Sequence, residues 1–371
     1  MVSDSALGGG SSSSNSGLAK IVEGNRGYGG GLASMKARNG GKLLWEGAWG
    51  PLAHESREAM APSTPFEIAS IAKMFTATAT LLLIGSGRLA SLTQPLASAA
   101  PRLILGGDGG GSSPLPPQWH NVTLQQLLQH TSGLQDYWES PEFRRAFDAD
   151  AQRLWTPWDI LEYAARLPSL LPRPHSYHYS DTNYIVAGLV VEEASGMSLG
   201  DYFERAIFQP LGMNSTYFNH LEPYRGPIAH RYEGEEDLTV KRRQSADWAG
   251  GGLVSTTADL HRFLLEGLVE GRLGGGPHIL DQMKSQPVPT DIEDVEYGLG
   301  LFLVDAEDEL GQGSRVWGHE GWGHSFLWYD EQAQVAAAGT VNQQDARADP
   351  YDAVMAVMAA GRRMLAAAME D

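Results

Sequence analysis

Residues 68–89 read IASIAKMFTATATLLLIGSGRL. This stretch is apolar on nearly every side, which predicts a helix that begins near Ser70, lies deep inside the protein and ends at a pair of glycines. Lys73 falls inside the apolar run and is the only lysine between Lys42 and Lys241. Burying a charged side chain costs free energy, so this lysine has to be considered together with the hydroxyl group beside it.

Ser70 and Lys73 are three residues apart, and positions i and i+3 of a helix share a face. A serine hydroxyl becomes a good nucleophile when a neighbouring base removes its proton, and a buried lysine can be that base. The free backbone N–H groups of a first helical turn also favour incoming negative charge. A capping serine beside a lysine that extends its amine to the solvent has the same spacing, so Ser-x-x-Lys alone leaves both interpretations open.

The neighbouring segments predict a sheet built from both ends of the chain, with helices between. Asn39-Gly40 is a strong hairpin-turn signal, with a strand expected on either side. Apolar residues that recur at three and four predict helices over residues 124–130 (capped by Thr123), 157–167, 183–196, 199–208 and 257–268. Strands are expected at residues 297–304, 314–320, 325–330 and 334–341, and a closing helix at about 352–369.

Composition excludes several classes of function. The chain has 371 residues, no cysteine and a formal net charge of −18. Without cysteine there is no disulfide, thiolate metal site or cysteine nucleophile. The negative charge disfavours binding to nucleic acid or to anionic membranes. We therefore expect no nucleic-acid partner, no membrane association and no metal or other cofactor, and the sequence does not indicate an oligomeric state.

The first residues predict neither a core nor a secretion signal. Residues 1–17 are rich in glycine and serine and predict a disordered tail, and residues 105–119 predict a surface loop rich in glycine and proline. The chain as written starts without a charged segment followed by an apolar one, so a cytoplasmic location is expected, although a leader removed beforehand would leave the same pattern.

A second group of reactive side chains lies in SYHYSDTNYIVAG, residues 176–188. Tyr179 immediately precedes the start of a predicted helix. A tyrosine there is either an ordinary core aromatic or a base, if a cation such as Lys73 lowers the pKa of its phenol. Tyr177 and His178 are weaker candidates for the same role.

A third group lies in WGHEGWGHSFLWYD, residues 317–330. Gly321 would allow another backbone or a ligand to approach a strand edge closely. His319 and His324 are five apart, so on a strand they point to opposite faces, and a metal site there is not expected. His319 alone is more typical of a structural residue.

Six blocks occur in a fixed order: SIAKMFTATATLLLIGSGRL, LLQHTSGL, YSDTNYIVAGLVVEEASG, IFQPLGMNSTYF, GGLVSTTADLHRF and GHEGWGHSFLWYD. Together they resemble the serine hydrolases related to class C β-lactamases, D-Ala-D-Ala carboxypeptidases, D-aminopeptidases and family VIII esterases. The resemblance spans about residues 20–345. It implies an α/β (α+β) fold of the β-lactamase/transpeptidase type, with a mixed sheet flanked by helices and an all-helical subdomain.

The resemblance also implies an organisation and a set of roles. Residues 18–371 would form one catalytic domain, with a sheet part at about 18–75 and 285–371 and a helical part at about 76–284. Ser70 would be the acylated nucleophile, Lys73 its partner, and Tyr179 the base that also protonates the leaving group. His319 and Gly321 would match the Lys-Thr-Gly element of β-lactamases, or the His-x-Gly element of many esterases. The backbone N–H groups of Ser70 and Trp322 would form the oxyanion hole.

Two departures from the β-lactamase pattern bear on the substrate. Asp181 replaces an asparagine that helps to hold the acylamide side chain of β-lactams, and an ionised Asp181 would favour the charged form of Lys73. His319 replaces a lysine that would bind a substrate carboxylate. Asp181, His319, Gly321 and Trp322 are therefore expected to contact the substrate, and efficient β-lactam hydrolysis is not expected.

These observations favour a carboxylic-ester hydrolase that forms an acyl-enzyme on Ser70. The tryptophans Trp138, Trp155, Trp158, Trp248 and Trp322 would suit an apolar acyl or alcohol group, although most are expected to pack in the core. The alternatives are a peptidase or amidase acting on D-amino-acid substrates, an acyltransferase, and a binding module without activity. Weak β-lactamase activity is compatible with the same residues. The expected partner is a small ester or amide.

Overall fold

The computed structural model describes residues 30–38, 41–105, 115–150, 152–168, 176–219, 224–239, 243–274, 278–341, 343 and 350–370. The tail predicted at residues 1–17, the Asn39-Gly40 turn and most of the loop predicted at 105–119 lie outside these residues. Within the described end of that loop, Leu115 and Trp119 are buried, so this part packs inward although a surface loop was expected. No helix among the described residues has the length and apolar character needed to cross a bilayer.

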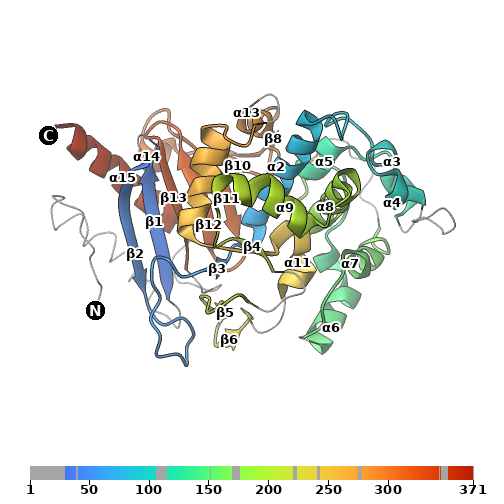
Figure 1. Cartoon of the computed structure of the whole chain (residues 1–371), viewed down its shortest axis with the longest axis horizontal. Helices are drawn as coiled ribbons and strands as arrows, with labels where there is room; N and C mark the ends of the chain where they lie inside the picture. The colour runs from blue at the N-terminus through green and yellow to red at the C-terminus, as the bar shows by residue number, and fades with distance from the viewer. Residues whose placement is uncertain are drawn as a thin grey trace.

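An eight-stranded sheet joins the two ends of the chain, as the sequence predicted (Figure 1). The strand order is β2-β1-β13-β12-β11-β10-β9-β8. These strands are β1 (Gly31–Ala37), β2 (Leu43–Trp49), β8 (Val288–Pro289), β9 (Val295–Tyr297), β10 (Phe302–Asp305), β11 (Arg315–Gly321), β12 (Ser325–Asp330) and β13 (Val335–Thr340). The sheet was expected to be mixed, but every pairing described in it is antiparallel, because most of its strands are joined to a neighbour by a short turn.

The strand predicted at residues 297–304 is interrupted. β9 ends at Tyr297 and β10 begins at Phe302, and Gly300 between them has a φ of +77°. A Cβ atom on Gly300 would lie 2.9 Å from the carbonyl oxygen of Lys73. This bend therefore brings the backbone of the sheet into direct contact with the helix that carries Lys73, a close approach that only glycine permits.

Helices supply most of the remaining structure. They are α2 (Ala72–Gly85), α3 (Leu96–Ala99), α4 (Pro101–Leu105), α5 (Leu124–Leu128), α6 (Pro141–Ala149), α7 (Pro157–Ala164), α8 (Asp181–Ser195), α9 (Leu199–Phe203), α10 (Gln209–Leu211), α11 (Arg243–Gly251), α12 (Thr257–His261), α13 (Ile279–Lys284), α14 (Glu307–Leu310) and α15 (Pro350–Glu370). Single 3-10 turns lie at Ala69–Ile71, Pro117–Trp119 and Tyr137–Glu139, and π-helical turns continue α9 at Glu204–Phe208 and α12 at Arg262–Val269. Thr123 caps α5 through a capping box, as its sequence predicted.

The segment expected to be all helical also contains short strands. β4 (Tyr217–Phe218) and β3 (Phe66–Glu67) both pair with β7 (Leu253–Ser255), and β5 (Tyr232–Glu233) pairs with β6 (Glu236–Asp237). These two- and three-residue strands lack the alternating pattern that identifies longer ones, because two residues contain no period. β3 and β7 matter for the site, since β3 leads directly into the turn that carries Ser70.

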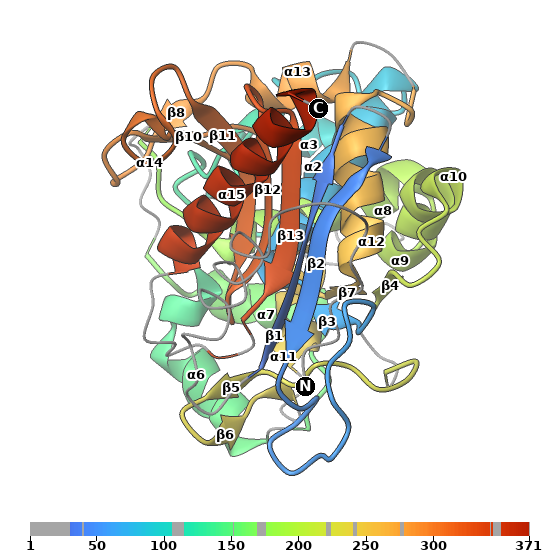
Figure 2. The same ribbon diagram turned by 90° about the vertical axis from the view of Figure 1, so that its left-hand side faces the viewer.

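Three layers bury the sheet on both faces. α15 crosses one face over β12 and β13, and α2 and α12 lie behind the opposite face (Figure 2). The alternation of strand residues explains this arrangement: Leu32, Leu327 and Ala336 belong to the large core shared with α2, whereas their neighbours belong to the smaller core under α15. The boundary predicted between residues 75 and 76 falls inside α2, so the expected sheet and helical parts share one core.

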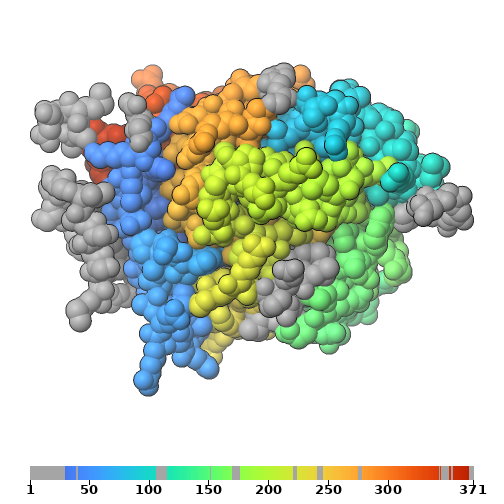
Figure 3. All heavy atoms as spheres, viewed as in Figure 1, coloured from blue at the N-terminus to red at the C-terminus, as the bar shows by residue number. Residues whose placement is uncertain are grey.

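The space-filling view shows how far the helical part extends from the sheet (Figure 3). β1 and β2, in blue, form one end of this face, and α6 and α7, in green, lie toward the other. α2 is the element common to both: its Lys73 carbonyl meets Gly300 of the sheet, and its fully buried Phe75 stacks on Phe263 of the helical part at a centroid distance of 3.8 Å. A reactive group at the start of α2 therefore lies where sheet and helices meet.

Candidate active site

Ser70 lies in a strained turn at the start of the central helix. The turn at Ala69–Ile71 precedes α2, and Ala69 has a φ of +44°, a left-handed conformation that costs about 1–3 kcal/mol for a residue with a Cβ atom. Ser70 is only partly buried, whereas Lys73, one turn later, is 0% exposed. The sequence predicted this buried lysine on the same face as Ser70.

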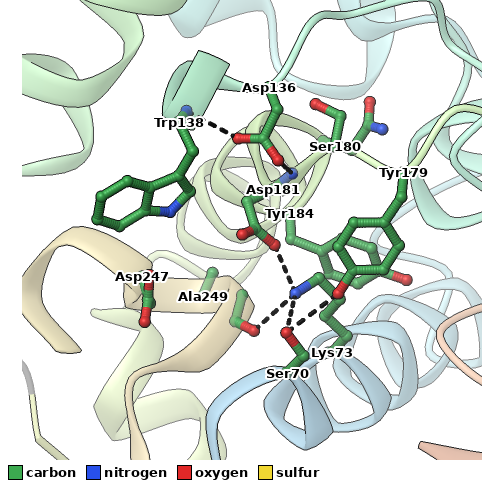
Figure 4. Close-up of polar contacts among 12 residues, drawn as sticks. Ser70, Lys73, Asp136, Trp138, Tyr179, Ser180, Asp181, Tyr184, Asp247 and Ala249 are labelled. Atoms are coloured by element: carbon green, nitrogen blue, oxygen red, sulfur yellow. Dashed lines mark hydrogen bonds and ion pairs between the residues drawn. The ribbon is translucent and has the colours of Figure 1, made fainter. Parts of the chain in front are cut away.

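The amine of Lys73 lies at the centre of a polar network (Figure 4). Its Nζ atom is 2.8 Å from Ser70 Oγ, 2.6 Å from Asp181 Oδ1 and 3.0 Å from the carbonyl oxygen of Gly250. The carbonyl of Gly250 reaches Lys73 because α11 is kinked at Trp248, where φ is +35°. The three contacts stabilise an ammonium ion in the interior.

Tyr179 completes a triangle with Ser70 and Lys73. Its hydroxyl donates to Ser70 Oγ at 3.0 Å, and its ring centroid lies 5.0 Å from Lys73 Nζ. Burial and the Asp181 carboxylate hold the pKa of Tyr179 well above 10, against the opposing effect of the hydrogen bond to Ser70. The hypothesis that Lys73 lowers this pKa to give a phenolate is therefore wrong for the resting protein. The phenol keeps its proton because burial and a nearby negative charge both oppose its loss.

The two weaker alternatives to Tyr179 lie differently. Tyr177 borders the same cavity, and burial raises the pKa of its phenol. His178 is partly exposed and has a carboxylate oxygen of Glu139 at 3.7 Å from its Nε2. Neither side chain has a hydrogen bond to Ser70 or Lys73 among the contacts that the structure describes.

Asp136 is a neighbour of this network that the sequence did not identify. Its carboxylate accepts the backbone N–H of Trp138 at 2.9 Å and that of Asp181 at 3.1 Å. Burial and the neighbouring Asp181 carboxylate raise the pKa of Asp136 to about 8. Asp136 thus lies beside the residue whose carboxylate pairs with Lys73. An aspartate that caps a short turn gives no sequence signal that distinguishes it from any other cap.

His319 is neutral and buried behind the site. Its Nε2 is 3.0 Å from the hydroxyl of Tyr297 and its Nδ1 is 2.6 Å from the carbonyl oxygen of Glu320. Burial, reinforced by the charge of Lys73, lowers the pKa of His319 to about 3. His319 therefore provides no cation at neutral pH, in line with the expectation drawn from its replacement of a lysine.

A second histidine, which the sequence did not identify, lies behind Tyr179. His130 is fully buried, its ring centroid is 4.2 Å from that of Tyr179, and its Nδ1 accepts the backbone N–H of Ser180 at 3.1 Å. Burial and Lys73 hold the pKa of His130 well below 6.5. A neutral imidazole ring thus fixes the plane of Tyr179 and the first residue before α8.

The end of β11 packs against the turn that carries Ser70. A Cβ atom on Gly321 would lie 2.5 Å from the carbonyl oxygen of Ile68 and 2.9 Å from the Cβ of Ala69. Ser325 Oγ, on the paired strand β12, donates to the same Ile68 carbonyl at 2.9 Å. The close approach predicted for Gly321 is therefore an approach to the backbone of the nucleophile turn.

A cavity of about 700 Å³ lies in front of Ser70. Its walls combine aromatic and apolar residues with carboxylates. They are Ala69, Ser70, Trp138, Tyr177, Tyr179, Asp181, Asp247, Gly250, Thr290, Asp291, Ile292, Phe302, His319, Glu320, Gly321 and Trp322. Every residue that the sequence predicted to contact the substrate thus borders one cavity. Among its described lining residues there is no lysine or arginine.

The five tryptophans fall into three groups. Trp138 and Trp322 border the cavity. Trp155 and Trp248 are buried in the core, and Trp158 is 41% exposed. Core packing thus involves three of the five, because Trp138 also packs against the main core, as the large area of an indole ring favours.

Within the described part of the chain, histidine and acidic side chains form no group of three or more with the geometry to hold a metal ion.

Comparison with known proteins places these features in a family. The family model described as Beta-lactamase matches residues 19–360. Penicillin-binding protein 4* of Bacillus subtilis (strain 168) is 30% identical over 199 residues, which cover 52% of this chain and 39% of that protein. Esterase EstB of Burkholderia gladioli is 32% identical over 216 residues, covering 56% and 51% respectively. The chain thus spans about half the length of these relatives or less.

A solved structure matches over nearly the whole length of both chains. The D-stereospecific amidohydrolase from Streptomyces sp. superimposes with a TM-score of 0.74 at 26% sequence identity, covering 92% of this chain and 97% of the other. The D-amino acid amidase from Ochrobactrum anthropi SV3, at 24% identity and a TM-score of 0.78, has the same fold. With a family model matched from residue 19 to residue 360, the chain belongs to the Beta-lactamase family.

Proposed function

We propose that the protein is a serine hydrolase that forms an acyl-enzyme on Ser70. One observation carries the proposal: Ser70 Oγ lies within 3.0 Å of both the Lys73 amine and the Tyr179 hydroxyl, on the wall of an open cavity. A nucleophile, a group that can take its proton and a second proton carrier are the parts that covalent catalysis on serine requires.

The protonation of the network assigns the two proton-handling roles. At rest, Lys73 and Tyr179 both donate to Ser70 Oγ, so neither can accept the proton of the attacking hydroxyl. The reactive form of the Ser70, Lys73 and Tyr179 network therefore has one proton fewer than the resting form. Because Tyr179 has a raised pKa and keeps its phenol proton, we assign the neutral amine of Lys73 as the base. Tyr179 then passes its proton to the leaving group, and the serine proton taken up by Lys73 replaces it. The role of base thus moves from Tyr179, as the resemblance implied, to Lys73, while Tyr179 keeps the role of acid.

Negative charge that develops on the substrate carbonyl needs two aligned donors. Ser70 and Trp322 both border the cavity, and β11 packs on the nucleophile turn through Gly321. We assign their backbone N–H groups as the oxyanion hole. Loss of one such donor typically costs about 3 kcal/mol in the barrier.

The lining of the cavity supports a carboxylic ester with an apolar acyl or alcohol group as the substrate. Trp138, Phe302 and Ile292 offer apolar surface, and His319 is neutral. With no lysine or arginine among the described lining residues, a substrate carboxylate finds no fixed cation on these walls. This argues against β-lactams and against peptides that end in a free D-alanine carboxylate.

The amide of a D-amino acid is the second candidate. The same walls carry the acidic residues Asp181, Asp247, Asp291 and Glu320, which would favour a substrate with a free amino group. The similarity to the Streptomyces amidohydrolase over 92% of this chain supports this candidate as well. An ester and an amide differ in the leaving group that Tyr179 must protonate, so the two candidates share one mechanism up to that step.

Intact-mass spectrometry with a small panel of substrates tests the proposal. The protein is mixed with aryl esters of short acids, D- and L-phenylalanine amide and nitrocefin, with Ser70→Ala as the matched control. We expect an acyl adduct from the esters that Ser70→Ala does not form. Faster turnover of D-phenylalanine amide than of any ester would select the second candidate. No adduct and no turnover with any compound, including a fluorophosphonate, would refute the hydrolase.

A further inference from the structure

A buried arginine joins the two backbone segments that would form the oxyanion hole. Arg231, immediately before β5, is 4% exposed. One end of its guanidinium group, Nη2, lies 3.0 Å from Glu67 Oε2, and the other, Nη1, donates to the carbonyl oxygen of Trp322 at 3.2 Å. The guanidinium carbon is also 4.7 Å from the centre of the Trp322 ring, close enough for a cation–π contact.

Glu67 connects this arginine to the nucleophile turn. It is the last residue of β3, three positions before Ser70, and its side chain is 2% exposed. The hydroxyl of Tyr224 donates to its other carboxylate oxygen, Oε1, so Oε2 is the oxygen that faces Arg231 as an ion pair. A planar guanidinium group between a carboxylate and a carbonyl fixes the separation of the two.

The backbone around the contact between Arg231 and Trp322 leaves the arginine side chain little freedom to move. The backbone N–H of Arg231 donates to Thr239 Oγ1 at 2.8 Å. Gly323, which follows Trp322, has a φ of +86°, and a Cβ atom there would lie 2.1 Å from the Cδ of Arg231. The arginine stem therefore packs directly on the turn between β11 and β12, where another residue would push it away.

Buried ion pairs contribute little net stability, because desolvation offsets their attraction. We propose that Arg231, held by Glu67, is a positioning residue that sets the backbone of Trp322 as an oxyanion donor relative to Ser70. The inference rests on the proposed function. It assigns no contact with the substrate to Arg231, which acts through Trp322.

The conservative variant Arg231→Lys tests this role, since lysine keeps the charge but loses the planar fork. We expect kcat on an aryl ester to fall about 10²-fold, as for a misplacement of about 1 Å. KM should change less than about threefold, because ground-state contacts with the cavity remain. An aryl boronic acid, whose adduct with Ser70 carries an oxyanion, should lose affinity by about the same factor as kcat/KM.

Arg362 provides a matched control. It also joins a buried carboxylate to a backbone carbonyl, with Nε 2.5 Å from Asp330 Oδ2 and Nη1 2.7 Å from the oxygen of Leu310, but it lies on α15 across the sheet. Arg362→Lys should lower the melting temperature while leaving kcat and boronate affinity unchanged. If Arg231→Lys behaves in the same way, Arg231 is only structural and the inference is overturned.

Two further measurements distinguish a variant that fails to fold, a failure of this inference and a failure of the proposed function. Should Arg231→Lys not fold, Glu67→Gln keeps the size of the side chain and weakens the link from the other end, and we expect the same split between kcat and KM. A folded Glu67→Gln variant with unchanged kcat contradicts the inference. Failure of the wild-type protein to react with a fluorophosphonate would instead contradict the proposed function, which separates the two failures.

Discussion

At the scale of single residues, the location of Lys73 is explained by the groups around it. Its side chain is fully buried, yet three acceptors surround the amine: Ser70 Oγ, Asp181 Oδ1 and the carbonyl of Gly250. An apolar helix can therefore carry this charge because other elements bring the oxygens to it. Asp136, with a pKa raised to about 8 by burial and the Asp181 charge, is mostly protonated at neutral pH, so the Asp181 carboxylate is the negative charge in contact with the amine.

Asp181→Asn tests whether this carboxylate holds the Lys73 amine in position. Asparagine keeps the size of the side chain but removes the charge that pairs with Lys73 Nζ at 2.6 Å, so the amine is held less firmly beside Ser70 Oγ. We expect kcat/KM to fall by about 10²-fold in steady-state assays. Asp291→Asn, which removes another carboxylate from the cavity wall, is the control and should lower kcat/KM far less. Equal losses in both variants would contradict the role of Asp181.

At the scale of elements, the site is a junction between a strand end and a helix start. β11 ends at Gly321 against the carbonyl of Ile68, and the strained turn at Ala69 follows. Neither element creates the geometry alone, because the left-handed conformation of Ala69 persists only while its surroundings enforce it. The turn is thus held by packing from β11 and β12 rather than by its own sequence.

Gly321→Ala should move the end of β11 away from the turn that carries Ser70. The new Cβ atom would meet Ser325 Oγ at 2.1 Å and the Ile68 carbonyl at 2.5 Å, so β11 must move away from Ser70. We expect kcat/KM to fall by about 10²-fold or more, with a loss of about 1–3 kcal/mol in the free energy of unfolding. Steady-state kinetics and urea denaturation measure the two effects.

Gly339→Ala is the control for overpacking in the same sheet. A Cβ atom on Gly339, in β13, would lie 2.4 Å from the carbonyl of Leu32, but β12 separates β13 from β11. This variant should lose stability without a comparable loss of kcat/KM. A Gly321→Ala variant that is destabilised but fully active would show that the junction does not position Ser70.

At the scale of the whole molecule, one sheet built from both ends of the chain encloses charged and titratable groups between its layers. His261 of α12 lies 2.8 Å from the hydroxyl of Ser34 in β1, and burial lowers the pKa of His261 to about 3. His130 and His319 are buried in the same way, with lowered pKa values. All three imidazoles must take up protons when the protein unfolds at mildly acidic pH.

The free energy of unfolding should therefore fall on acidification. A histidine with a folded pKa of about 3 and an unfolded value near 6.5 contributes stability that is fully present above pH 6.5 and is lost as the pH falls toward 3. The slope is up to about 1.4 kcal/mol per pH unit for each such histidine. His261→Gln keeps a hydrogen-bonding group for Ser34 and removes this titration, so urea denaturation between pH 4 and 7 should show a shallower slope. A slope equal to that of the wild type would contradict this account.

Local patterns in the sequence were enough to identify the elements with a clear period and the ordered motifs. It predicted the buried helix after Ser70, the strands at both ends of the chain, the capped α5 and the close approach at Gly321, because apolar periodicity, caps and glycines report local preferences. The serine, lysine and tyrosine of the site were also identified, through motifs whose order resembles a known family.

The surroundings of those groups follow from the three-dimensional fold. Asp136, His130 and Arg231 act at the site through contacts with residues about 40 to 90 positions away, and no local pattern records such contacts. The sequence left the protonation of Tyr179 open, and in the structure burial and the charge of Asp181 raise the pKa of its phenol well above 10. A pKa depends on the three-dimensional balance of desolvation and charge, and that balance exists only once the sheet and the helices have closed around α2.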